Sequence, residues 1–296
     1  MKIHELDNVE VNLNDGHKYA LVDIKCGENV IKYGNPIGHA TADIKAGEHV
    51  HTHNLKTNLS DNIEDEYTPH EAKPIAACDR TFMGYRREWG GVGIRNEIWI
   101  INTVGCVNKI SKRIAELTGA FAFEHPFGCS QLGDDQKVTQ KILAGMVRHP
   151  NAAGVLVLGL GCENNNIDVF KEHLGEYDAD RVRFLNCQDV EDEVSEGVRI
   201  VNELRLRAEK YKREPIPLRE LTVGLKCGGS DGYSGITANA LVGRLTDKLT
   251  SIGGRCVLTE VPEMFGAEHL LMQRCESREI FDKTVKLINH FKDYYT

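Results

Sequence analysis

The stretch GVLVLGLG at residues 154–161 is the strongest indication of the fold in this chain. Its apolar run is far shorter than the roughly 20 residues that a helix needs to cross a bilayer. We interpret residues 154–160 as a buried strand, and IWIINTVG at 98–105 has the same character. NKISKRIAELTG at 108–119 follows with the periodicity of a helix that ends at a glycine cap.

The same alternation extends outward from these two strands. Further strands are predicted at 120–123 and 182–186, and further helices at 134–149, 167–175 and 190–212. Strands that alternate with helices of this length predict crossover units and a mostly parallel sheet. REPIPLRE at 213–220 indicates a joint, after which the pattern resumes with a strand at 221–227, a helix at 237–252 and a strand at 255–261.

The N-terminal region has a different pattern, because DIKCGENV at 23–30 recurs as DIKAGEHV at 43–50. Each copy predicts a strand, a glycine turn and a second strand, which indicates a small β domain built from two hairpin units. After Asn54 the chain becomes polar and acidic, without clear periodicity. We therefore predict a β domain at 1–75, a linker at 76–91, an α/β domain at 92–215, and at 216–296 the start of a third α/β domain that continues further.

Composition narrows the classes of function. The 296 residues are 41% hydrophobic and 27% charged, as expected for a globular protein, and the net charge is −8. Scattered basic residues on an acidic chain argue against nucleic-acid binding, and no segment predicts a membrane span. The N-terminus lacks the apolar core of a secretory signal, and the nine cysteines show no disulfide framework. We expect a cytoplasmic protein with reduced thiols.

HVHTHN at residues 49–54 carries three histidines at alternate positions. On an extended strand His49, His51 and His53 would project from one face, where neutral imidazoles bind divalent transition metals. The alternative is a solvent-facing strand that happens to be rich in histidine. We favour a metal site at His51 and His53, with Asn54 as a neighbouring carbonyl ligand.

Cysteines accumulate at or just after the carboxyl ends of predicted strands, which is the edge where open parallel sheets bind ligands. The alternative is that cysteine, as a small apolar residue, suits tight strand-to-helix turns. Glycine-rich loops that also hold polar side chains lie at the same places, among them HPFGCSQLGDD at 125–135 and KCGGSDGYSG at 226–235. The cysteines concerned are Cys106, Cys129, Cys162, Cys187 and Cys227.

Three common enzyme classes are disfavoured. GLGCENN at 159–165 has Asn164 where a dinucleotide fingerprint would have its third glycine. The chain has no G-x-x-x-x-G-K-[ST] and no G-x-S-x-G motif, which argues against a P-loop NTPase and an α/β-hydrolase.

Several long motifs closely resemble the altronate and galactarate dehydratase family. They are AGEHVHTHN, HPFGCSQLGDD, MVRHPNAAGVLVLGLGCENN, CGGSDGYSGITAN and LTEVPEMFGAE, which are spread over essentially the whole chain. Family members are longer, so the resemblance identifies this chain with their N-terminal portion. It implies an N-terminal β domain of the SAF type, a following α/β region, and a hydro-lyase assisted by iron(II), with manganese(II) as an alternative ion.

The expected reaction is the β-elimination of water from D-altronate to give 2-dehydro-3-deoxy-D-gluconate, a step in hexuronate breakdown. A metal bound to the substrate carboxylate would stabilise the enediolate that forms when the C2 proton leaves. With His51 and His53 as metal ligands, we predict His125 and Cys129 as catalytic residues, although His125 could instead cap the adjacent helix or pack against Pro126. The predicted substrate-binding residues are Gly228, Gly229, Ser230, Asp231 and Glu163.

Alternative functions remain at this stage. A relative that acts on galactarate or sulfolactate would share the metal chemistry, and a non-catalytic fragment would only bind substrate or metal. An iron–sulfur hydro-lyase using Cys106, Cys129 and Cys162 would show charge-transfer absorption. The expected partners are a small sugar acid and, in a homo-oligomer, further copies of the chain.

Overall fold

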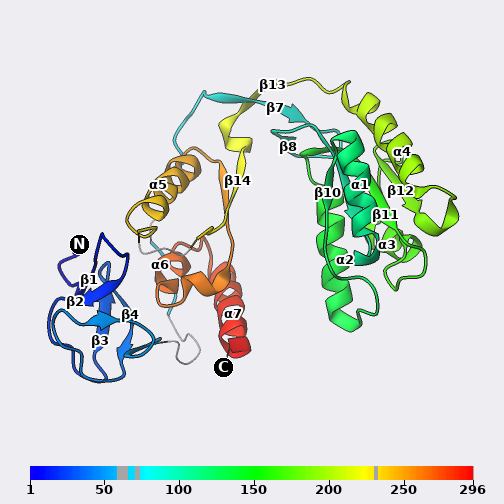
Figure 1. Ribbon diagram of the computed structural model, residues 1–296. Helices are drawn as coiled ribbons and strands as arrows, with labels where there is room; N and C mark the ends of the chain where they lie inside the picture. Colours follow the sequence, from blue (N-terminus) through cyan, green and yellow to red (C-terminus); the bar gives the residue numbers. More distant parts are fainter. Residues whose placement is uncertain (59–65, 71–73, 230–232, 296) are drawn as a thin grey trace. The chain divides into compact units, whose positions relative to one another are not determined.

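The computed structural model describes residues 1–58, 66–70, 74–229 and 233–295, and it divides into two compact units (Figure 1). One unit comprises Met1–Cys78 together with Leu221–Thr296, and the other comprises Asp79–Glu220. Each unit has its own hydrophobic core.

The N-terminal residues form a small all-β domain with two antiparallel sheets, of order β1-β2-β5 and β3-β4-β6. The strands are β1 Val9–Val11, β2 Lys18–Ala20, β3 Asn29–Lys32, β4 Asn35–Ala40, β5 His49–Val50 and β6 Leu55–Lys56. Val9, Ala20, Ile24, Val30, Ala40, Ile44 and Val50 are buried together as its core. The predicted small β domain is confirmed.

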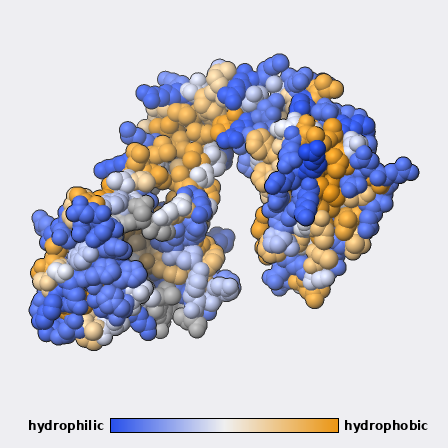
Figure 2. Space-filling view, in the orientation of Figure 1, coloured by the Kyte–Doolittle hydropathy of each residue, from blue (hydrophilic) through white to orange (hydrophobic). Residues whose placement is uncertain are grey.

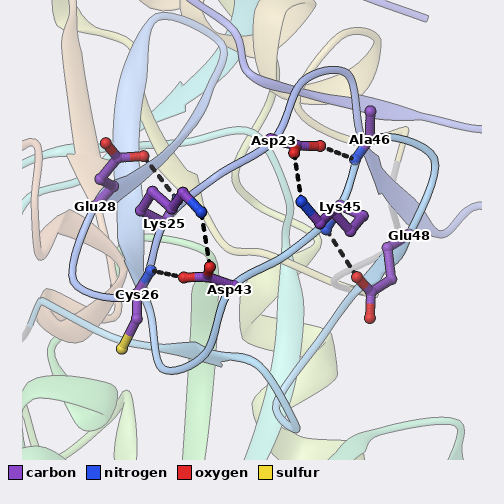
Figure 3. Close-up of polar contacts among 8 residues, drawn as sticks. All are labelled: Asp23, Lys25, Cys26, Glu28, Asp43, Lys45, Ala46 and Glu48. Carbon is purple, nitrogen blue, oxygen red and sulfur yellow. Dashed lines mark hydrogen bonds and ion pairs between the residues drawn. The ribbon is translucent and has the colours of Figure 1, made fainter.

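The two related segments, 23–30 and 43–50, pair with each other reciprocally (Figure 3). Lys25 Nζ lies 2.8 Å from Asp43 Oδ2, and Lys45 Nζ lies 2.7 Å from Asp23 Oδ2. The backbone N–H of Cys26 donates to Asp43 Oδ1, just as that of Ala46 donates to Asp23 Oδ1, each at 3.0 Å. The repeat in the sequence therefore produces a local twofold arrangement.

Backbone geometry repeats as well. Ile24 and Ile44 form an isolated antiparallel bridge. This bridge takes the place of the first strand that we predicted in each hairpin. Each copy then turns at a glycine, Gly27 with φ of 86° and Gly47 with φ of 83°. Glycine adopts such positive φ values without the steric cost that other residues incur. The second arms are β3 and β5.

The Asp79–Glu220 unit is built on a four-stranded parallel sheet of order β10-β9-β11-β12. Every residue of β11 is buried, as expected for a strand covered on both faces. This confirms the predicted mostly parallel α/β region. The strands are β9 Glu97–Asn102, β10 Phe121–Phe123, β11 Ala152–Gly159 and β12 Val182–Asn186, and the helices are α1 Asn108–Thr118, α2 Gly133–Val147, α3 Ile167–Leu174 and α4 Glu193–Ala208.

Alternate strand residues face two helical layers. Ile100 and Leu156 belong to the core formed with α1 and α4, whereas Ile101, Val155 and Val157 belong to the core formed with α2 and α3. The helix after β9 and the helix after β11 therefore cover opposite faces. In doubly wound sheets, the carboxyl ends of two such neighbouring strands border the crevice where ligands bind.

Helix ends follow the local chemistry of the chain. Gly119, with φ of 71°, caps α1 in the left-handed conformation, which confirms the predicted glycine cap. Asn166 and Asp192 cap the amino ends of α3 and α4, where their side chains accept hydrogen bonds from the backbone N–H groups of Val169 and Ser195.

A small antiparallel sheet lies in stretches for which we predicted a linker and a joint. It has the order β13-β7-β8, with β7 at Thr81–Arg86, β8 at Val92–Gly93 and β13 at Glu214–Pro217. Pro215 and Pro217 are tolerated because β13 is an edge strand. The segment at 76–91 thus contains regular structure, because its pairing partner comes much later in the sequence.

The C-terminal residues form a second parallel β-α-β unit. Strands β14 Thr222–Leu225 and β15 Arg255–Leu258 pair in parallel, joined through α5 Ala238–Ser251. Helices α6 Glu268–Met272 and α7 Arg278–Tyr295 follow, and 3-10 turns occur at η1 Gly105–Val107, η2 Cys187–Asp189, η3 Leu218–Glu220 and η4 Val261–Met264. Among the described residues, no helix combines the length and the apolar character needed to cross a bilayer.

Candidate functional site

The histidine-rich segment does not form the extended strand that its spacing predicted. Strand β5 ends at Val50, and residues 51–54 form a turn. Asn54 closes this turn, because its side chain accepts a hydrogen bond from the backbone N–H of His51 and donates one to the carbonyl of His49. Asn54 is only 5% exposed, so its predicted role as a metal ligand is wrong, and its amide is structural.

The turn nevertheless leaves the imidazoles close together, with His49 at the centre. Its ring centroid lies 5.6 Å from that of His51 and 5.7 Å from that of His53. His17, which precedes β2, approaches the same ring at 5.0 Å, and Tyr19 approaches it at 5.5 Å. Spacing within 49–54 could not reveal His17, because only the pairing of β2 with β5 brings it there.

The electrostatics around His49 favour a neutral imidazole. Its pKa lies below the ordinary value of 6.5, first because burial penalises the charged form and then because other imidazoles surround it. Its Nε2 atom is buried and has no hydrogen-bond partner among the described residues. Neutral imidazole nitrogen is the form that binds transition metals.

The described part of the chain holds no ready-made metal site, since no three His, Cys, Asp or Glu side chains there have donor atoms suitably arranged around one point. His51 and His53 are exposed, and the His51 ring can turn once the 3.1 Å contact between its Nδ1 atom and Thr52 Oγ1 opens. The chemistry of the donors and the unpartnered Nε2 of His49 fit a transition-metal ion, while the assignment of His51 and His53 as ligands stays a prediction.

The carboxyl edge of the four-stranded sheet collects most of the predicted cysteines. Cys106, Cys129 and Cys162 are exposed there. Cys187 follows β12 directly but is buried, and burial raises the pKa of its thiol to about 12. Cys227 follows β14 in the other unit, so four of the five share one sheet edge.

His125 lies in the loop after β10, and its ring braces that loop. Nε2 lies 2.8 Å from the carbonyl oxygen of Asn102, which can only accept, so Nε2 must carry the proton. Nδ1 accepts a 3.2 Å hydrogen bond from the backbone N–H of Phe127. The ring thus has a structural role other than the helix cap or Pro126 packing considered above, and the catalytic role of His125 stays a prediction.

Glu163 lies at the carboxyl ends of β9 and β11, where its carboxylate is fully used in hydrogen bonds within the protein. Its carboxylate is 3% exposed, and it accepts hydrogen bonds from Thr103 Oγ1 at 2.6 Å, Leu160 N at 3.0 Å and Gly161 N at 2.6 Å. Removing it would leave those donors unpaired in a buried site. The geometry therefore favours a role in holding the GLGCENN loop over the predicted contact with substrate.

The loop that carries Cys129 is held in an uncommon backbone conformation. Gly128 has φ of 102°, and a Cβ there would lie 2.3 Å from the carbonyl oxygen of Thr103, so only glycine fits. Ser130 has φ of 56°, which is unfavourable for a residue other than glycine and is typical of functional loops. Cys129 lies between them with its thiol exposed, and its predicted catalytic role stays a prediction.

The predicted substrate loop after β14 is partly described. Gly228 and Gly229 are exposed, whereas Ser230 and Asp231 lie outside the described residues. Helix α5 begins at Ala238, close to the predicted start at 237, and the two glycines precede it in the loop after β14. Their contact with substrate stays a prediction.

A pocket of about 510 Å³ lies at the carboxyl ends of β14 and β15. Polar and charged side chains line part of it, among them Lys226, Asp247, Glu263 and Arg274, but most of the lining is apolar. Figure 2 shows apolar side chains gathered over α5 and β14. Such walls match a hydroxyl-rich sugar acid poorly, so we do not assign the substrate to this pocket.

Comparison with known proteins gives consecutive family matches. The altronate/galactarate dehydratase SAF domain matches residues 2–58, the second domain of D-galactarate dehydratase/altronate hydrolase matches 84–209, and the D-galactarate/altronate dehydratase C-terminal model matches 218–296.

Curated relatives agree with these matches. The chain is 50% identical to the altronate dehydratases of Bacillus subtilis (strain 168) and Escherichia coli (strain K12), over 100% of this chain and 66% of each relative. It is 27% identical to galactarate dehydratase (L-threo-forming) of Escherichia coli (strain K12), over 99% of this chain and 65% of that protein. It thus spans about two thirds of the length of these relatives. The chain belongs to the altronate/galactarate dehydratase family.

Proposed function

We propose that this chain is the N-terminal part of a hydro-lyase that removes water from D-altronate to give 2-dehydro-3-deoxy-D-gluconate. The observation that carries the proposal is the contrast between relatives, because identity is 50% to two altronate dehydratases but 27% to a galactarate dehydratase. We also propose a cytoplasmic location and assembly into a homo-oligomer.

The elimination requires two proton transfers, the following tautomerisation requires two more at the enol oxygen and at C3, and no net change of oxidation state occurs. The C2–H bond breaks, the C3 hydroxyl leaves as water after protonation, and the resulting enol gains a proton at C3 to become the 2-keto acid. Negative charge develops on the substrate carboxylate and C2 as the first proton leaves. A bound Fe2+ or Mn2+ would supply electrostatic stabilisation of that charge.

Each predicted site residue would have its own task in this reaction. His51 and His53, in the β domain, would hold the ion through neutral imidazole nitrogen. His125 would accept or return a proton at Nδ1, which requires only that the 3.2 Å bond from Phe127 N opens. Cys129 is the second candidate for proton transfer, because it is exposed in the same loop as His125, between β10 and α2.

Substrate hydroxyl and carboxylate groups would be bound by the loop that contains Gly228, Gly229, Ser230 and Asp231. The two described glycines are exposed, and no atom lies within 4 Å of an added Cβ at either position. The backbone there is therefore accessible to a ligand.

An assay over three acids tests this proposal. The chain, loaded anaerobically with Fe2+, is incubated with D-altronate, galactarate and (2R)-sulfolactate, and products are identified by mass spectrometry. The Bacillus subtilis altronate dehydratase serves as the positive control. We expect 2-dehydro-3-deoxy-D-gluconate from D-altronate, at a rate at least about tenfold above that with either other acid.

Two results would contradict it. Preferential turnover of galactarate or sulfolactate would reassign the substrate within the same reaction class. If the chain binds iron while only the longer control releases product, the alternative of a non-catalytic binding fragment is correct.

A further inference from the structure

The imidazole cluster, in which His17, His51 and His53 surround His49, comes from two segments that are distant in sequence. Strand β2 pairs antiparallel with β5, with Tyr19 opposite His49, so the residue before β2 reaches the ring from one side. His17 meets it edge-on, with an interplanar angle of 81°. His51 and His53 approach from the turn that follows β5.

The Nε2 atom of His49 is the atom of the cluster that is best suited to bind a ligand. It is buried and unpartnered among the described residues, although buried polar nitrogen atoms are normally paired. The carboxylate of Asp15, in the same region, already accepts hydrogen bonds from the backbone N–H of His17 and from Tyr19 Oη, both at 2.9 Å. A cation bound by His49 would therefore be surrounded mainly by neutral imidazole nitrogen atoms.

Ring spacing is compatible with a shared ion. A metal–nitrogen bond of about 2.1 Å places an imidazole centroid about 3.2 Å from the ion, so rings at the tetrahedral angle have centroids about 5.2 Å apart. The observed separations from His49 are 5.0, 5.6 and 5.7 Å. His51 is nearly parallel to His49, at 19°, so its exposed ring must turn before its nitrogen can point to the ion.

We infer that His49 and His17 are ligands of a cation site that His51 and His53 complete, and that this nitrogen-rich site selects late first-row transition ions. The inference deepens the proposed function and rests on it, since it names the ligands and the class of ion. Imidazole donors bind such ions in the order that places Mn2+ below Fe2+ and Co2+, and they discriminate against Mg2+ and Ca2+. Of the two ions expected from the family, the site therefore favours Fe2+.

The scaffold offers a matched variant. Asn29 occupies the equivalent position of the other repeat, so His49→Asn introduces a side chain that the same local fold already accommodates.

Titration with Co2+, followed by its visible absorption and by calorimetry, tests the ligand assignment in the intact chain. We expect His17→Ala and His49→Asn each to weaken Co2+ binding at least tenfold, with Mg2+ and Ca2+ unable to displace the ion. His39→Ala is the control, because His39 Nδ1 contacts Asn58 and its ring has no recorded contact with the cluster. Its Co2+ affinity should stay within twofold of the unmodified chain.

A second measurement covers the case in which a variant fails to fold. In the unmodified chain, Zn2+ should shift the imidazole 15N resonances of His17 and His49 but not those of His39. The inference is overturned if those resonances stay unchanged, or if His51→Ala and His53→Ala abolish Co2+ binding while His17→Ala and His49→Asn leave it intact. Loss of Co2+ in the latter variants, together with no dehydration of D-altronate by the unmodified enzyme, would instead overturn only the proposed function.

Discussion

The two copies of the repeat, residues 23–30 and 43–50, share a backbone but differ in what surrounds their last strand. In the first copy, Asn29 Oδ1 accepts a hydrogen bond from Asn58 at 2.9 Å, and its carbonyl accepts one from Asn8 at 2.8 Å. In the second copy, His49 occupies the corresponding position and is surrounded by other imidazoles. Val30 and Val50, the next residues, are both fully buried.

This difference shows how one scaffold can carry chemistry on one side only. The ion pairs, the glycine turns and the buried valines occur in both copies, so we expect both copies to contribute equally to the stability of the domain. The imidazole cluster is asymmetric because His17 and the turn at 51–54 lie beside the second copy only. Substitutions at paired positions should therefore have equal effects on stability, whereas metal binding should depend on one copy.

The largest expected effect is at the paired isoleucines. Ile24 and Ile44 are each 1% exposed and bridge the two copies, so Ile24→Ala and Ile44→Ala should each reduce the free energy of unfolding by about 2–5 kcal/mol. Hydrogen exchange at the Val30 and Val50 amides reports on this domain. Val22→Ala, at a side chain that is 53% exposed, is the control. Effects that differ by more than about 1 kcal/mol between the copies would contradict the symmetry.

A smaller effect is expected at the turns. Gly27→Ala and Gly47→Ala should each cost about 1–2 kcal/mol, because φ near +85° is strained for alanine although no neighbour lies within 4 Å. Gly145→Ala is the matched control, since it also has open space but lies inside α2, where alanine should stabilise by up to about 1 kcal/mol. Urea unfolding of the three variants distinguishes strain from crowding. A neutral result at either turn would remove the strain argument.

The reciprocal ion pairs should contribute less, because all four side chains are more than half exposed. Hydrogen bonds from Lys45 and the Ala46 amide lower the pKa of Asp23, and those from Lys25 and the Cys26 amide lower that of Asp43, relative to 3.8. Their stabilisation is therefore present above the unfolded-state pKa and is lost as pH falls through the folded-state pKa.

Asp23→Asn and Asp43→Asn should accordingly destabilise the domain slightly and equally at pH 7, and have no effect well below pH 3.8. Unfolding curves at both pH values, with and without 1 M salt, measure this. A difference between variant and parent that persists in acid would show that the carboxylate charge is not the cause.

The smallest effect is expected where the copies differ without chemical consequence. Cys26→Ala makes the first copy match Ala46 of the second, and it removes only an exposed thiol contact with the Thr41 carbonyl at 3.3 Å. We expect a change below about 0.5 kcal/mol in urea unfolding. A larger loss would show that the copies are less equivalent than their backbones indicate.

Much of the fold could be predicted from local patterns. Apolar runs at 98–105 and 154–160 predicted β9 and β11, and the helical period up to Gly119 predicted α1 with its cap. The pairing of β7 with β13 could not be predicted, because the partners are distant in sequence and the prolines of β13 argued against a strand.

The candidate site divides in the same way. The histidines in 49–54 could be recognised from the sequence as a candidate site. The expected strand is a turn instead, because the side chain of Asn54 makes hydrogen bonds that close it. His17 was missed because only tertiary strand pairing brings it to His49. Glu163 was assigned to substrate because its spacing could not show that Thr103 and two backbone amides already use its carboxylate.

The reciprocal hydrogen bonds of the repeat have a consequence for assembly. Gly27 N–H donates to the carbonyl of Ala40, and Gly47 N–H donates to that of Ala20, so neither half can satisfy its own turn. A polypeptide that contained only one copy of the repeat would therefore need a second molecule to supply these hydrogen-bond partners. The β domain is thus arranged like a homodimer whose two subunits are joined in one polypeptide chain. One copy can therefore change its side-chain chemistry while the other maintains the fold.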